Sequence, residues 1–284
     1  MAGSVLFSAK AVVVKLAYRH GVDAVTLLAL RMLFAAPFFA VTLAWSSRGR
    51  VALTGGQHAR IILLGVLGYY AASYFDFLGL QHVSAGLERL ILYLYPTIVV
   101  LISVLFLRRG FTRQDGIALV VAYAGILAAF WHDLGTGGEG NVPLGAALVF
   151  ASAFTYAIYL VLAGELVHKV GAIRLTAYAI LVSTAAVLLQ AALQNPLAAF
   201  VQPAPVYLLS AVNGFFCTVL PAFATMLAIE RIGASRTAMT AMIGPLATIA
   251  LAWVLLGEAM TGWGLAGAAL VLAGVLILSR SKVR

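Results

Sequence analysis

The sequence has few charged residues and only one cysteine in a chain of 284 residues. Charged residues make up 10% of the chain, against roughly 25% in a typical soluble domain, and 63% of the residues are hydrophobic. A water-soluble fold of this size could not hide so much apolar surface, so the bilayer must be the solvent for most of the chain. With Cys217 as the single cysteine, no internal disulfide framework can form.

The sequence also lacks the motifs of several enzyme classes. It contains no P-loop, no H-E-x-x-H and no G-x-S-x-G, so ATP hydrolysis, zinc proteolysis and serine hydrolysis have no signature. The segment 135–140 matches G-x-G-x-x-G, but it follows an apolar run and not a strand, so we interpret it as a turn. We expect a protein that is not an enzyme and that uses no metal and no cofactor.

The net charge of +9 is the one feature that points towards nucleic acid. The positive charges lie in short segments between apolar runs, and no basic stripe is interleaved with aromatic residues as a nucleic-acid surface requires. We therefore expect membrane lipid and a small-molecule substrate as partners, and no nucleic acid.

Long apolar runs fill most of the chain. A helix needs about 20 apolar residues to cross a bilayer core about 30 Å thick. The first run is long enough for a full span and is followed by no cleavage-site pattern, so we expect it to be the first helix. The sequence predicts ten spans, at 2–18, 24–45, 60–80, 85–107, 114–131, 144–164, 172–193, 205–229, 236–257 and 262–279. The fold class is therefore an all-α membrane protein.

Lysine and arginine alternate between the two sides of these predicted spans. One set of loops and the C-terminal tail carry thirteen of them, whereas the opposite side has only Arg19. Because positive residues collect on the cytoplasmic side, both termini are predicted to be cytoplasmic in a bacterial inner membrane.

The two halves resemble each other at a spacing of 149 residues. The matched pairs are Gly65 with Gly214, Pro96 with Pro245, Leu107 with Leu256, Thr112 with Thr261, and Ala124-Gly125 with Ala273-Gly274. Each half contains five spans, and because five is odd the second half must enter the membrane in the opposite sense. The sequence predicts an inverted repeat within one membrane domain, with halves 1–133 and 134–284, which is a recurring plan of secondary transporters.

Charged residues also occur inside or near the predicted spans. They are Lys10, Lys15, Arg31, Asp76, Glu88 and Arg89. A charge at the bilayer centre costs roughly 2.5–3.5 kcal/mol, so most of them must pair with one another or face water. We expect a polar vestibule towards the outer side, where Asp76 and Glu88 face a substrate ammonium and Lys10 and Arg89 face a carboxylate. The alternative is a set of satisfied ion pairs and snorkelling ends, and this structural role is favoured for Lys15 and Arg31.

Asp76 and Glu88 are also the candidates for proton coupling, although passive facilitation is equally compatible with the sequence. Aromatic and amide side chains away from the helix ends are the remaining candidates for substrate contact: Tyr70, Tyr74, Tyr93, Tyr156 and Asn213. The alternative for any single tyrosine is packing or an interfacial belt. Pro96 and Pro245 fall inside spans and are candidate hinges, with static kinks as the alternative.

Several of these positions match a known family in order and spacing. They are Lys15, Arg31, Pro96, Pro245, Gly257-Glu258, Gly267 and Gly274. On these residues the chain resembles the EamA-type ten-helix exporters of the drug/metabolite transporter superfamily. The chain departs from the family pattern at Phe7-Ser8, where Trp-Gly is frequent, and at Arg108-Arg109, where Gly-Glu is frequent.

The resemblance implies a secondary transporter that exports small metabolites, and in particular amino acids, aromatic ones among them, by alternating access. The alternative substrates are phosphorylated metabolites or nucleotide sugars, which would suit the basic residues. The alternatives of another class are an intramembrane enzyme and a non-transporting membrane subunit. We expect a monomer or a weak homodimer, because the small residues of the last span favour internal packing.

Overall fold

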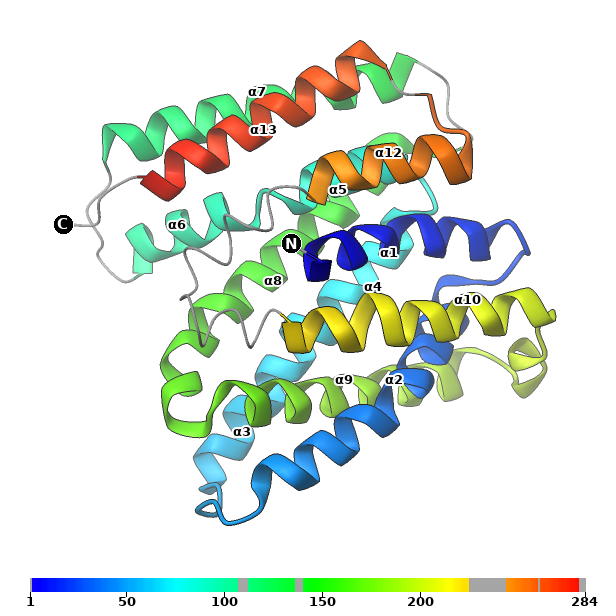
Figure 1. Ribbon diagram of the computed structural model, residues 1–284, viewed down its shortest axis with the longest axis vertical. Coiled ribbons are helices and arrows are strands. Elements are labelled where there is room, and N and C mark those ends of the chain that lie inside the picture. Colours follow the sequence, from blue (N-terminus) through cyan, green and yellow to red (C-terminus); the bar gives the residue numbers. More distant parts are fainter. Residues whose placement is uncertain (1, 107–111, 136–139, 225–243, 260, 281–284) are drawn as a thin grey trace.

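The computed structural model describes residues 2–106, 112–135, 140–224, 244–259 and 261–280 (Figure 1). Over these residues the chain is helical and contains no strand. The helices of the first half are α1 (Ala2–Tyr18), α2 (Ala24–Ser47), α3 (Gly55–Leu64), η1 (Gly65–Ala71), α4 (Ala72–Gly79), α5 (Ala85–Leu92), α6 (Tyr95–Phe106) and α7 (Arg113–Gly135). Those of the second half are α8 (Val142–Val170), α9 (Ala172–Gln194), η2 (Leu197–Phe200), α10 (Ala204–Gly214), η3 (Phe215–Val219), α12 (Gly244–Leu256) and α13 (Gly262–Arg280).

The helices follow the ten predicted spans. Among the described residues, seven helical segments are long and apolar enough to cross a membrane, and 244–256 and 262–278 are shorter apolar helices. Helix α1 has 17 residues, as predicted. Parts of the predicted spans 205–229 and 236–257 lie outside the described residues. The prediction of an all-α membrane protein with ten spanning helices is confirmed.

Local side-chain chemistry decides where several helices begin. Asp23 caps α2, because its carboxylate accepts hydrogen bonds from the backbone N–H groups of Val25 and Thr26. Thr54 and Gln57 form a reciprocal capping box that starts α3 in a polar stretch, five residues before the predicted start. Helix α8 runs on to Val170 and ends where Gly171 adopts a φ of +89°.

The fourth span is broken and the third and eighth are distorted. Helix α5 ends at Leu92 and α6 begins at Tyr95, directly before Pro96, whose ring nitrogen cannot donate to the preceding turn. In the third span the π-helical segment η1 starts at Gly65, and in the eighth span η3 follows Gly214. Gly65 and Gly214 are 149 residues apart, so the two π segments lie at nearly equivalent places in the two halves.

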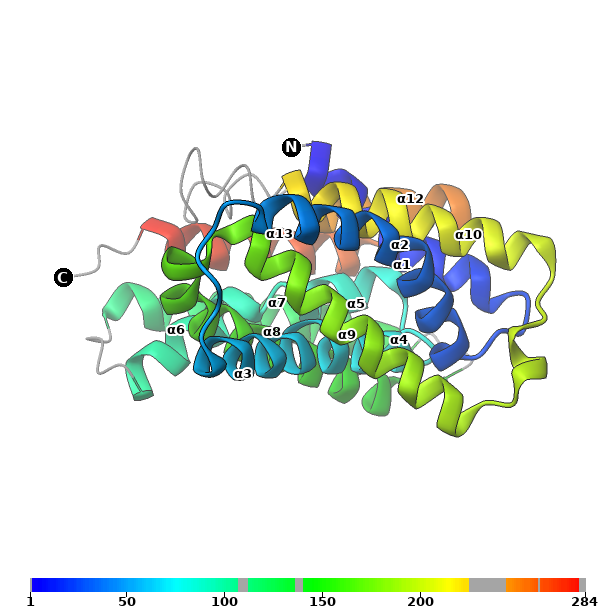
Figure 2. The same ribbon diagram turned by 90° about the horizontal axis from the view of Figure 1, so that it is seen from below.

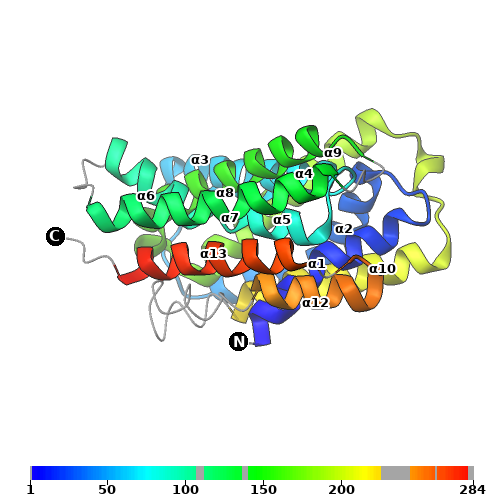
Figure 3. The same ribbon diagram turned by 90° about the horizontal axis from the view of Figure 1, so that it is seen from above.

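The helices lie in two layers. Figures 2 and 3 show α1, α10, α12 and α13 in one layer and α3, α6, α7 and α8 in the other. The largest hydrophobic cluster joins the halves, since α1 and α2 residues pack there with Val187, Val206 and Ala252 of the second half. The core is therefore shared between the halves and not divided at residue 133.

Close backbone contacts repeat at the 149-residue spacing. Helices α7 and α13 lie side by side and run in opposite directions (Figure 1). A Cβ on Gly125 of α7 would lie 2.6 Å from the carbonyl oxygen of Gly267, and a Cβ on Gly274 of α13 would lie 2.7 Å from that of Ala118. Because 118 and 267 differ by the same 149 residues as 125 and 274, the two contacts are equivalent. Only glycine permits both approaches.

Candidate functional site

A buried ionic cluster joins three helices of the first half. The ammonium of Lys10, on α1, lies 2.6 Å from the carboxylate of Asp76 on α4 and 3.3 Å from that of Glu88 on α5. All three side chains are almost completely buried, with Glu88 fully so. One lysine therefore serves two carboxylates, and one carboxylate could take up a proton or a second cation without leaving Lys10 unpaired.

Arg89 extends this cluster towards the second half. Its guanidinium donates to the hydroxyl of Ser8 at 3.2 Å and lies over the rings of Phe7 and Tyr93, 4.8 Å and 5.5 Å from their centroids. The Thr248 hydroxyl, on α12, donates to the carbonyl oxygen of Ser8 at 3.0 Å. Lys10, Glu88 and Arg89 thus lie where α1 and α5 meet α12, which is an interface between the halves.

Arg31 and Asn213 lie on the other side of the same region. Arg31, on α2, donates to the Ser73 hydroxyl at 3.0 Å and lies over the ring of Phe77. Asn213 is the last residue but one of α10 and is fully buried. Cys217, one turn beyond it, is also buried.

A row of aromatic rings leads away from Arg89. The Tyr93 ring contacts Tyr95, Tyr95 contacts Tyr156, and Tyr156 stacks on Tyr159, with centroid separations of 6.3, 5.4 and 5.7 Å. The Tyr159 hydroxyl lies 3.2 Å from that of Tyr69. The row connects the ionic cluster with α8, so Tyr93 and Tyr156 belong to one continuous aromatic surface.

Tyr70 and Tyr74 are placed differently. Their rings stack on each other with centroids 6.2 Å apart, and both are half-buried against the core cluster around α1 and α2. Within the described part of the chain, no hydrogen bond or cation–π contact joins either ring to Lys10, Asp76 or Glu88. These two tyrosines lie apart from the charged cluster that the sequence analysis associated with them.

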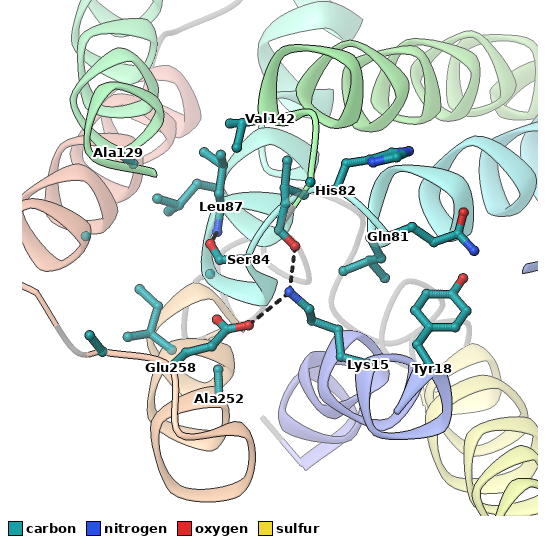
Figure 4. A pocket seen from close by; sticks show the side chains of 18 of the residues that line it. Lys15, Tyr18, Gln81, His82, Ser84, Leu87, Ala129, Val142, Ala252 and Glu258 are labelled. Atoms are coloured by element: carbon teal, nitrogen blue, oxygen red, sulfur yellow. Dashed lines mark hydrogen bonds and ion pairs between the residues drawn. The ribbon is translucent and has the colours of Figure 1, made fainter. Parts of the chain in front are cut away.

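An open cavity of about 780 Å³ lies at the end of the bundle where α1 ends and α5 begins (Figure 4). Lys15 crosses it, since its ammonium donates to the Val83 carbonyl oxygen at 2.7 Å and lies 3.2 Å from the carboxylate of Glu258. Glu258 also accepts from the backbone N–H of Ala85. Figure 4 shows Tyr18, Gln81 and His82 on the wall beside Lys15.

The cavity and the ionic cluster do not coincide. Lys10, Asp76, Glu88 and Arg89 are absent from the cavity lining, which reaches Leu87 and Leu90 of α5 instead. These charges were expected in an open vestibule, but they form a closed layer deeper in the bundle. Removing one partner of a buried ion pair leaves an uncompensated charge at a high free-energy cost, so buried charges are found together. The sequence signal for Lys15 and Glu258 was their place in the family pattern. Ser8 was marked only as part of a departure from that pattern, and nothing in the sequence marked Thr248.

Pro96 lies one residue inside α6, beside the break at Tyr93, and Pro245 is the second residue of α12. Both prolines stand near the cluster's level, because Arg89 lies one turn before the break and a Cβ on Gly244 would lie 2.6 Å from the Tyr93 hydroxyl oxygen. The two candidate hinges thus flank the same region from opposite halves.

A ten-helix bundle with paired charges buried between its halves is typical of a multi-pass membrane transporter. The EamA-like transporter family model matches this chain at residues 1–131 and 143–280, and the chain belongs to that family. It is therefore a transporter of the drug/metabolite transporter superfamily and not an enzyme.

Relatives and a solved structure agree with this assignment. The chain is 34% identical over 263 residues to "Uncharacterized transporter YcbK" of Bacillus subtilis (strain 168), covering 90% of this chain and 83% of that protein. It is 25% identical over 231 residues to an "Uncharacterized transporter" of Archaeoglobus fulgidus, covering 78% of each. A crystal structure with 19% sequence identity superposes with a TM-score of 0.68 over 97% of this chain and 93% of that one, so the fold is shared.

Proposed function

We propose that this transporter exports amino acids, aromatic ones among them, across a bacterial inner membrane by alternating access. The observation that carries the proposal is the buried layer in which Lys10, Asp76, Glu88 and Arg89 present both signs of charge at the interface of the halves. A zwitterion matches both signs, since carboxylates can receive its ammonium and a guanidinium its carboxylate.

The aromatic row supports the choice among zwitterions. It begins at the ring under Arg89 and continues through Tyr95 to Tyr156, so a substrate held by its charged groups would place its side chain against tyrosine faces. Aromatic pairs in such contacts contribute about 0.5–1.5 kcal/mol beyond area burial. Asn213 would add an amide to the polar end of the site. In this proposal Tyr70 and Tyr74 contact the substrate only in a conformation in which the third span has moved.

Phosphorylated metabolites and nucleotide sugars are the second candidate. Lys10, Arg31 and Arg89 would suit phosphate. Asp76 and Glu88 oppose it, because two buried carboxylates beside the same lysine would repel a multiply charged anion.

Alternating access requires the two halves to exchange conformations. The equivalent contacts of Gly125 and Gly274, and the opposite directions of α7 and α13, support two halves, 1–133 and 134–284, inserted in opposite senses. Pro96 and Pro245 are the hinges in this proposal. With both termini cytoplasmic, the cavity that holds Lys15 and Glu258 opens to the outside.

Asp76 and Glu88 are proposed to couple export to proton entry. A proton on Glu88 would leave Lys10 paired with Asp76 alone. The place of the Glu88 carboxylate beside Lys10 could then be taken by the substrate carboxylate. The proposal also includes a small-molecule substrate, membrane lipid as the surrounding solvent, and a protein that is a monomer or a weak homodimer.

The test is flux into proteoliposomes with a panel of amino acids, sugars and phosphates, with and without a pH gradient. We expect aromatic and other neutral amino acids to be carried, and the gradient to accelerate them. In Glu88→Gln the acceleration should disappear, whereas Asp115→Asn, a matched control at the start of α7, should keep it. Flux confined to phosphates, or a Glu88→Gln protein with unchanged gradient dependence, would contradict the proposal.

A further inference from the structure

Arg31 is a deeply buried cation without a carboxylate within ion-pair distance in the described part of the chain. Its side chain is only 4% exposed. One terminal nitrogen donates to Ser73, the guanidinium lies 4.7 Å from the centroid of Phe77, and its Nε has no hydrogen-bond partner. A guanidinium keeps its charge at any physiological pH, so Arg31 cannot escape this burial by losing a proton.

The eighth span brings a second unsatisfied group to this place. Both amide atoms of Asn213 are fully buried and lack hydrogen-bond partners. The next residue, Gly214, packs so closely on α2 that a Cβ there would lie 2.8 Å from the Arg31 carbonyl oxygen. A buried polar group without a partner is destabilising, so this contact is suited to receive a hydrogen-bonding species.

The charge balance indicates which species. Among the described residues, the buried layer holds three cations, Lys10, Arg31 and Arg89, but both of its carboxylates, Asp76 and Glu88, lie on Lys10. Arg89 has Ser8 and two aromatic faces, whereas Arg31 has Ser73 and one aromatic face, and the Nε of each guanidinium has no hydrogen-bond partner. One positive charge is in excess, and water could satisfy the donors but not the charge.

We infer that Arg31 and Asn213 hold a small monovalent anion at the contact of α2, α4 and α10. Guanidinium and amide N–H groups are the donors that bind a carboxylate or a halide. The anion has two sources, free chloride or the carboxylate of the transported molecule, and only the second source rests on the proposed function. In either case the anion neutralises Arg31 and accepts a hydrogen bond from the side-chain NH2 group of Asn213.

The experiment measures the melting temperature of the purified full-length protein in detergent at constant ionic strength. Sodium isethionate is the reference salt, and chloride or acetate replaces it stepwise. We expect the melting temperature to rise and saturate with chloride, with acetate or with both. In Arg31→Gln the concentration for half-saturation should increase by about tenfold or more, because a charge-assisted hydrogen bond is lost.

Two further variants keep the test decisive. Arg113→Gln, at the exposed start of α7, should respond to anions as the unchanged protein does. Arg31→Lys keeps the charge and remains informative if Arg31→Gln does not fold, and it should bind the anion more weakly because an ammonium lacks the planar fork.

The outcomes separate the sources and the two proposals. A response to chloride alone assigns an inorganic anion, and a response to acetate that competes with a carried amino acid assigns the substrate carboxylate. A response to acetate without amino acid flux would support the anion site and contradict the proposed function. The inference is overturned if neither anion stabilises the protein, or if Arg31→Gln and Arg31→Lys respond as the unchanged protein does.

Discussion

The two halves of the molecule share their backbone contacts but not their chemistry. Gly125 and Gly274 make the same approach to carbonyl oxygens 149 residues apart, yet Lys10 in the first half corresponds to Tyr159 in the second. Lys10 binds two carboxylates, whereas Tyr159 bonds to the Tyr69 hydroxyl. Cys217, which is buried, corresponds to Gly68, where the Tyr159 ring leaves no space for a Cβ.

This difference teaches that the scaffold is symmetric and the binding chemistry is one-sided. In the proposed alternating access, exchange of conformations between the halves needs equivalent helix contacts, and glycine recurs where the backbones touch. In the proposed binding site, the buried charges come from the first half. The second half contributes hydroxyls and rings.

The largest expected effect contrasts Lys10→Met with Tyr159→Phe. Removing Lys10 leaves Asp76 and Glu88 buried without their cation, which costs about 3–5 kcal/mol. Removing the Tyr159 hydroxyl loses one interhelical hydrogen bond, worth about 0.6 kcal/mol in a membrane protein. Denaturant unfolding in detergent measures both. Equal losses of unfolding free energy in the two variants would contradict the chemical difference between Lys10 and Tyr159.

The symmetric part of the comparison is tested at the glycines. Gly125→Ala and Gly274→Ala should each destabilise the protein by about 1–3 kcal/mol, because a methyl group would press on a carbonyl oxygen of the opposite helix. Gly164→Ala in α8 is the control, since nothing lies within 4 Å of its Cβ position, and it should stabilise by about 0.5–1 kcal/mol. Thermal unfolding of the three variants measures these changes. A Gly164→Ala protein destabilised as much as the other two would contradict the claim that Gly125 and Gly274 make equivalent close contacts.

The smallest expected effect concerns helix caps. Asp23 caps α2, whereas α9 begins after Gly171, which has no capping side chain. Burial opposes ionisation of Asp23, but hydrogen bonds from Thr26, Asn195 and Val25 outweigh it and lower its pKa. Because the folded-state pKa is lowered, the stabilisation is present above the unfolded value of roughly 4 and is lost as pH falls through the folded value.

Asp23→Ala should therefore cost about 1 kcal/mol at neutral pH. The gap in melting temperature between the two proteins should narrow as pH falls below about 4. A gap that stayed constant down to pH 3 would mean that the carboxylate charge does not carry the cap.

Much of the fold could be predicted because apolar length dictates a span. The ten helices agree with the apolar runs, and the misjudged ends have local causes, such as the capping box that starts α3 in polar sequence. The π segments escaped prediction because they depend on where Gly65 and Gly214 meet another helix. The cost of buried charge required the charged groups to pair or to face water, and the pairing of Lys10 with Asp76 and Glu88 is the alternative to the vestibule that the sequence analysis expected.

The depth of the cluster could not be predicted, since only packing shows that the open cavity stops at Leu87 and Leu90. The same holds for the partners of Lys15. Its position in α1 indicated a charge near one end of a span, but only the fold brings the end of α12 next to it, so that Glu258 becomes its counter-ion.

The most direct test of the central claim, that the buried charges lie on the transport path, uses the single cysteine. Cys217 is 2% exposed and lies one turn beyond the buried Asn213. In proteoliposomes, mass spectrometry would follow modification of Cys217 by a small anionic methanethiosulfonate, with Cys217→Ser as the blank. We predict that modification occurs in the folded protein, stops transport and slows when substrate is added. A folded, transporting protein whose Cys217 never reacts, or reacts at a rate that substrate does not change, would contradict the account.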